Sequence, residues 1–174
     1  MKTRAIHRCL AATFVTAASL AVSLVGCGPP EARAPNPMRP IDEGRAVKLI
    51  AQAMSAEGIQ PAAPRTVSLS GATSVVLDVG AQGRQIGVVY LTASDLHELG
   101  DNPLAKRPSV GSELIVRGGE GPDDGMHVVV LYASDYVYDD NVGEDREATA
   151  ITAENKLDRD VRDFVIIARK NHWP

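Results

Sequence analysis

Cysteine is scarce in this chain of 174 residues, and both of its cysteines lie within the first 27 residues, at positions 9 and 27. From residue 28 onward there is no thiol, which excludes a disulfide framework, a cysteine-based zinc site and a cysteine nucleophile there. Such a domain must be held together by its hydrophobic core alone. Aromatic residues make up only 4% of the sequence, so that core must consist mainly of Val, Leu, Ile and Ala.

Basic residues are in the minority. Lys and Arg number 18 against 22 Asp and Glu, and three of the 18 lie in the first 26 residues. The rest of the chain therefore carries 15 basic and 22 acidic side chains, a net charge of −7 with neutral histidine. Nucleic-acid binding needs a basic face that displaces phosphate counterions, so we expect no nucleic-acid partner. The same balance disfavours a domain that lies flat on anionic lipid.

The apolar run near the start of the chain is too short for an ordinary membrane-spanning helix. It covers residues 9–25, which is 17 residues, and several of these are Thr or Ser. A spanning helix needs about 20 predominantly apolar residues. A short cationic segment precedes the run and small residues end it, as in secretory signals. Pro29 and Pro30 then prevent a helix from continuing, so we predict an export signal over residues 1–26.

The run ends in Leu24-Val25-Gly26-Cys27, which resembles the lipobox of bacterial lipoproteins. The resemblance covers residues 1–27 only. It implies that Leu24, Val25 and Gly26 are recognition positions, that the thiol of Cys27 takes a diacylglyceryl group with acyl chains such as palmitate, and that cleavage falls before Cys27. At about 0.8 kcal/mol per buried CH₂, two or three chains anchor a protein permanently. Because Gly28 rather than Asp follows, the resemblance also implies the outer membrane in a two-membrane cell.

Two further segments complete the expected organisation. Residues 28–40 contain five prolines and no apolar periodicity, which predicts that residues 27–40 are a lipidated cysteine followed by a stiff, polyproline-like tether. At about 3.1 Å per residue, this tether would reach about 40 Å. Residues 41–174 are enough for one hydrophobic core, so we predict a single globular domain there.

Hydrophobic periodicity predicts an α+β fold with the element order α-β-β-β-α-β-β-α. The expected helices cover residues 42–57, 93–99 and 153–171. The expected strands cover residues 66–69, 74–79, 85–91, 113–117 and 126–133, and residues 136–138 would extend the last of them. We expect a single mixed or antiparallel sheet of about five strands, with the N-terminal and C-terminal helices packed on it.

The opening order α-β-β-β-α-β resembles the restriction-endonuclease-like fold. Members that cleave nucleic acid have an acid on the second strand and an acid-x-Lys motif on the third. Asp78 fits the first requirement, but the third strand contains Val89-Tyr90-Leu91 instead of the second acid and the lysine. The resemblance therefore implies neither a metal site nor nuclease activity.

Two segments contain residue types that occur in catalytic or phosphate-binding sites. Ser94, His97 and Asp101 have the letters of a catalytic triad, but triads normally converge from separated segments, whereas these three lie side by side on one short helix. Residues 118–125 are rich in glycine, yet they connect strand to strand and carry three acids. Phosphate loops lead into a helix N-terminus, so we predict a hairpin tip instead.

The acidic loop at residues 135–147 is a candidate for Ca²⁺, because hard cations prefer clustered oxygen ligands. Its spacing departs from the EF-hand template, since Gly143 falls one place early and the closing bidentate Glu is absent. A solvated loop without a cofactor is the default expectation, and Ca²⁺ binding is the alternative. The candidate ligands are Asp139, Asn141, Glu144 and Asp145.

No coherent catalytic set emerges from these residues, so we predict a non-enzymatic, lipid-anchored binding or accessory module that contacts another protein of the cell envelope. Four tyrosines on a shared face would suit such contacts. We also expect Trp173 to close the core and His127 to face away from its strand neighbours. The alternatives are an envelope hydrolase or small-ligand binder with a site built from distant residues, and a purely structural envelope lipoprotein. The tyrosines are Tyr90, Tyr132, Tyr136 and Tyr138.

Overall fold

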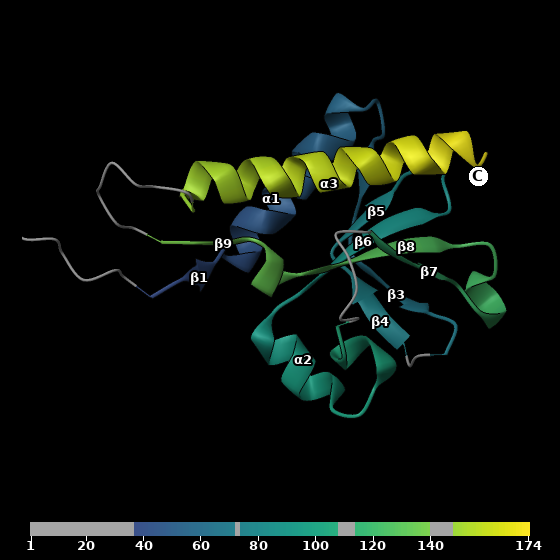
Figure 1. Ribbon diagram of the computed structural model, residues 1–174. Coiled ribbons are helices and arrows are strands. Elements are labelled where there is room, and N and C mark those ends of the chain that lie inside the picture. The colour runs from purple at the N-terminus through teal and green to yellow at the C-terminus, as the bar shows by residue number, and fades with distance from the viewer. Residues whose placement is uncertain (1–36, 72–73, 108–113, 140–147) are drawn as a thin grey trace, which may run out of the picture. The chain divides into compact units, whose positions relative to one another are not determined.

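The computed structural model describes residues 37–71, 74–107, 114–139 and 148–174, which all belong to one compact unit of residues 35–174 (Figure 1). The helices of this described part are α1 (Glu43–Ala56), α2 (Ala93–Leu99) and α3 (Ala150–Lys170). The strands are β1 (Arg39–Pro40), β2 (Pro61–Ala62), β3 (Arg65–Ser68), β4 (Ser74–Leu77), β5 (Val79–Ala81), β6 (Ile86–Leu91), β7 (Ile115–Gly118), β8 (His127–Tyr132) and β9 (Val137–Tyr138).

Five of the strands form one mixed sheet in the order β2-β5-β6-β8-β7. The central strands β6 and β8 run parallel, and every other pair in this sheet is antiparallel. The expected α+β class and the five-stranded sheet are confirmed. β7 and β8 are joined through residues 119–126 as an antiparallel hairpin, which agrees with the hairpin predicted for the glycine-rich segment.

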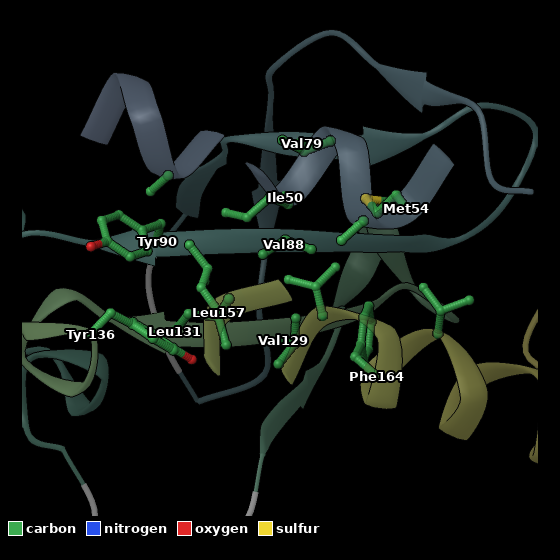
Figure 2. Close-up of a cluster of buried hydrophobic side chains, with 14 of the residues drawn as sticks. Ile50, Met54, Val79, Val88, Tyr90, Val129, Leu131, Tyr136, Leu157 and Phe164 are labelled. Carbon is green, nitrogen blue, oxygen red and sulfur yellow. The ribbon is translucent and has the colours of Figure 1, made fainter. Parts of the chain in front are cut away.

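The two faces of β6 and β8 belong to two separate hydrophobic cores, because successive side chains on a strand point to opposite faces. Figure 2 shows the first core, in which Val88, Tyr90 and Val129 pack against residues of α1 and α3. The second core holds the alternate residues, including Val89 and Val128, against β3 and β4. All six residues of β6 are buried, as expected for a central strand covered on both sides.

The strands β3 and β4 form a separate antiparallel ladder instead of extending the main sheet. The segment after β3 returns to the end of β7, since the N–H of Ser70 donates to the carbonyl of Gly118 at 2.9 Å and Leu69 is bridged to Gly119. The main sheet has the expected five strands, but the expectation that it is the single sheet of the domain was wrong, because further strands form two separate two-stranded ladders. The predicted strand at residues 74–79 is two strands, β4 and β5, which are interrupted at Asp78.

The helix ends follow the local chemistry of the sequence. Asp42 caps α1 by accepting the N–H of Arg45 at 3.2 Å, and Gly58 follows the helix with a positive φ of 71°. Thr92 and Asp95 form the predicted capping box of α2. α3 begins three residues before its expected start, because a second capping box at Thr149 opens it.

Salt bridges clamp α1 against α3, which lie together over one face of the main sheet (Figure 1). Arg45 contacts Glu154 at 2.8 Å near one end, and Glu57 contacts Arg169 at 3.0 Å near the other. Beyond α3, the ring of Trp173 packs against the first core. It stacks on His127 with 3.9 Å between ring centroids.

The short strands β1 and β9 pair with each other, Arg39 opposite Tyr138 and Pro40 opposite Val137. The sequence had predicted that residues 136–138 extend β8. In the structure they turn away from β8 instead, and β9 pairs with β1 at the start of the described residues. The expected boundary between tether and domain, at residue 40, lies inside this pairing. Ile41 continues the contact by donating its N–H to the carbonyl of Tyr136 at 3.0 Å.

Candidate functional site

The most prominent feature outside the two cores is a fork where β4 separates from β6. β5 pairs with β6 at Val79 and Val88, and the N–H of Asp78 still donates to the carbonyl of Val88 at 3.0 Å. Beyond that point β4 pairs with β3 instead. The next N–H on this edge of β6, that of Tyr90, donates to Oδ2 of Asp78 at 2.6 Å. An acidic side chain thus replaces the carbonyl that a neighbouring strand would supply.

A second carboxylate caps the same edge one step further along. Alternate residues of a strand direct their N–H groups to the same side, so Thr92 follows Tyr90 on this edge. Its N–H donates to Oδ2 of Asp95 at 2.7 Å, and its hydroxyl donates to the same oxygen at 2.7 Å. The capping box of α2 therefore fixes Asp95 beside the fork as well as starting the helix.

The fork opens into a cleft of about 570 Å³, a volume within the range of small-molecule sites. Its walls combine apolar and acidic side chains from β4, β6, α2 and the start of α1. Val76 is 58% exposed on one wall, unusual for a β-branched residue within a strand. The lining residues are Glu43, Ser74, Val75, Val76, Asp78, Val89, Tyr90, Leu91, Asp95, Glu98 and Leu99.

The cleft perturbs the titration of Asp78. Partial burial raises the pKa of this carboxyl from 3.8 to about 6 by penalising the charged form, and the Tyr90 N–H opposes part of that rise. The negative charges of Glu43 and Asp95 raise the pKa further. Burial, assisted by Asp42 and Glu43, also raises the pKa of Tyr90 to about 12. Asp78 is therefore an anion near neutral pH that a modest change in its surroundings would protonate.

Tyr90 forms part of the floor of the cleft and belongs at the same time to the first core (Figure 2). Its hydroxyl donates to the carbonyl of Ile41 at 2.9 Å. This bond connects Tyr90 to Ile41, which is followed by the helix cap Asp42 and then by Glu43, the first residue of α1. The acidic groups of the cleft thus come from three elements that the tertiary fold brings together, α1, the fork and α2.

The chemistry of this arrangement favours a positively charged ligand. Among the described residues that line the cleft, none is Lys, Arg or His. The ion pairs formed by described residues use other acids, such as Glu57, Asp123 and Glu154. Within the described residues, the negative charges of the cleft therefore have no ion-pair partner.

The serine, histidine and aspartate in and after α2, which are the residue types of a catalytic triad, do not belong to the cleft. Ser94, His97 and Asp101 are all exposed, and none of them lines the cleft. The prediction that these residues do not form a triad agrees with this arrangement. The helix itself contributes to the site through Asp95, Glu98 and Leu99 instead.

The tyrosines do not share a contact surface, so the condition under which they would suit protein contacts is not met. Tyr90, Tyr132 and Tyr136 are 1%, 1% and 2% exposed. Each hydroxyl donates inside the fold, that of Tyr132 to Leu104 at 3.0 Å and that of Tyr136 to Asp160 at 2.9 Å. Only Tyr138 is half-buried, with the guanidinium of Arg39 5.0 Å above its ring. Both faces of the sheet are covered, which leaves no open face for tyrosines.

The remaining predicted site residues fall largely outside the described residues. Leu24, Val25, Gly26 and Cys27 lie there, as do three of the four candidate calcium ligands, Asn141, Glu144 and Asp145. Asp139 is described, and its N–H donates to the carbonyl of Ala148 at 2.9 Å. Within the described ranges, no group of three or more His, Asp or Glu side chains is placed to hold a metal ion.

The cleft was not identified from the sequence, although one signal for it was present. Asp78 is the only charged residue in the otherwise apolar run of 74–79. Its partners Glu43, Asp95 and Glu98 are distant in sequence and have no recognisable spacing.

In the described part of the chain, no helix has the length and apolar character to cross a bilayer. Comparison with protein-family models, with curated proteins and with solved structures finds no match to this chain.

Proposed function

We propose that this chain is an exported lipoprotein whose folded unit is a binding module, with the cleft at the β4–β6 fork as its ligand site. Cys27 carries the lipid anchor, and in a two-membrane cell the outer membrane is the favoured location. The ligand comes from the cell envelope, either free or carried by an envelope protein.

One observation carries the choice of site: Asp78 is held as a partly buried carboxylate next to two further acids. Such a group costs folding stability, and perturbed ionisable residues in clefts are concentrated at functional sites. The mixed apolar and acidic lining supports the same interpretation, because ligand sites combine hydrophobic walls with a few placed polar groups.

The anchor is tested by growing cells that express the full chain with a labelled fatty acid. Wild-type protein should incorporate the label, and a Cys27→Ser variant should not. A Cys9→Ser variant is the matched control, because it also removes a thiol but leaves the lipobox intact. Absence of label from the wild-type chain would refute the anchor.

The site is tested by amide chemical shifts of the full-length protein in detergent micelles, titrated with small cationic, neutral and anionic organic probes. Saturable shifts at the amides of Tyr90 and Thr92 are expected for at least one class of probe, since both N–H groups donate to carboxylates that line the cleft. If no class of probe shifts these amides, the cleft is not a ligand site.

An envelope hydrolase is the second candidate, and the pKa of Asp78 is the observation that favours it. A value of about 6 suits a general acid or base that works near neutral pH. Chromogenic esters and glycosides provide the assay. Turnover by the wild type that an Asp78→Asn variant loses, while the variant still binds a probe in the cleft, would favour catalysis over simple binding.

A further inference from the structure

We propose that the ligand of the cleft is an aliphatic chain that ends in a primary ammonium group, as in a diamine or a lysine side chain. This inference rests on the proposed function, because it names the ligand class for the same site. It draws on three properties of the cleft: its shape, its charge and its exposed apolar wall.

The charge comes from four carboxylates on three elements, namely Glu43 of α1, Asp78 at the fork, and Asp95 and Glu98 of α2. Asp78 and Asp95 use their Oδ2 atoms to hold the edge of β6. An ionised carboxylate offers about four lone-pair sites on its two oxygens, so these contacts do not use up the acceptor capacity of either side chain. A cationic ligand would therefore find acceptors in the cleft without breaking the hydrogen bonds that maintain the fork.

The apolar wall indicates what should be attached to the cation. Val76 is exposed, and Val75, Leu91 and Leu99 contribute further lining beside the acids. A bare metal ion would make no use of these side chains, and no group of metal-ligating side chains is found among the described residues. A flexible methylene chain packs on such a surface while its charged end stays among carboxylates, as lysine side chains do.

The distribution of the acids favours an ammonium over a guanidinium group. A guanidinium is a planar fork that matches a single carboxylate through two parallel bonds. An ammonium is a compact charge with three donors that point in different directions. Carboxylates that line the cleft from α1, the fork and α2 suit the second geometry, since a compact charge on a flexible chain is attracted to all of them without having to match the plane of any one.

The test uses full-length protein in detergent micelles, with amide shifts and calorimetry as readouts. The probes are 1,5-diaminopentane, its neutral analogue 1,5-pentanediol, and a blocked Ala-Lys-Ala tripeptide. We expect the diamine or the peptide to shift the amides of Tyr90 and Thr92 saturably, with affinity that falls as salt is raised. Tighter binding of the peptide would identify a lysine on a partner protein, and tighter binding of the diamine a free polyamine.

Two variants, each of which removes one negative charge, distinguish binding at the cleft from a general effect of the protein's net charge. Glu98→Gln should weaken ammonium binding about tenfold, because Glu98 is exposed on α2 and lines the cleft. Asp163→Asn should leave affinity unchanged, because Asp163 lies on α3 away from the fork. Equal effects of the two variants would overturn the inference. If pentanediol binds as tightly as the diamine, the ligand class is wrong but the site stands. If none of these three probes binds, the ammonium ligand is refuted, and the cleft itself is refuted as a site only if the anionic probes of the previous test also leave the amides unshifted.

Discussion

Replacing Asp78 by Asn should stabilise the protein at neutral pH, although it removes a side chain that holds the fork together. The amide oxygen of Asn can still accept the Tyr90 N–H, so the contact that spans the fork is retained. What disappears is a negative charge that is half-buried and lies near Glu43 and Asp95. A protein that keeps such a charge gives up stability, which is common at functional sites.

The magnitude follows from the pKa of Asp78. A rise from 3.8 to about 6 means that, before solvent screening is considered, the charged carboxylate lowers the free energy of unfolding by about 3 kcal/mol. The side chain is only partly buried, so solvent screening reduces this to about 1–2 kcal/mol. Because the folded state holds the proton more tightly than the unfolded chain, stability falls as pH rises from about 4 to about 6 and is then constant. The gain from Asp78→Asn should therefore be largest above pH 6.5 and vanish near pH 4.

Thermal unfolding followed by the fluorescence of Trp173 is a suitable assay, because Trp173 is the only tryptophan and it stacks on His127. For a domain of this size the melting temperature should rise by about 3–8 °C at pH 7.5. Asp163→Asn changes net charge equally and serves as the control, with a shift near zero. A melting temperature that falls at every pH would refute the reasoning, since it would mean that the carboxylate stabilises the fork.

Three further predictions concern other parts of the chain. Gly119→Ala should destabilise the protein by about 3 kcal/mol or more, because the new Cβ would collide with the backbone of Asp123; unchanged denaturant midpoints would contradict this. Tyr132→Phe should cost about 1–2 kcal/mol in the same assay, since it leaves the buried carbonyl of Leu104 without its donor; no loss would mean that this carbonyl has another partner. Millimolar Ca²⁺ should leave the melting temperature unchanged if the acidic loop at residues 135–147 is solvated, and a rise that a chelator reverses would establish a calcium site.

The main elements could be predicted because their signals are local. The helical spacing of Leu157, Val161 and Phe164 marks α3, and the cap formed by Thr92 and Asp95 marks α2. Short apolar runs rich in valine mark β6 and β8. By contrast, β1 and β2 are two residues long and contain proline, so only their partners in the folded chain define them as strands.

The cleft could not be predicted from local sequence patterns, for a different reason. Asp78 interrupts a run that otherwise favours one long strand, and sequence alone does not say whether the chain bends there or continues. The bend depends on β3, which draws β4 away from β6 through their own pairing. The sequence also could not reveal that a second layer covers each face of β6 and β8. A shared tyrosine surface could therefore be considered from the sequence, although three of the four tyrosines are buried.

The hydrogen bond from Tyr90 to Ile41 gives the fold a mechanical property. Tension on the chain ahead of Arg39 would act first on the two-residue pairing of β1 with β9, and then on Ile41, whose carbonyl holds the Tyr90 hydroxyl. Tyr90 also lines the cleft. A pull on the N-terminal segment would thus load a residue that an occupant of the cleft also meets.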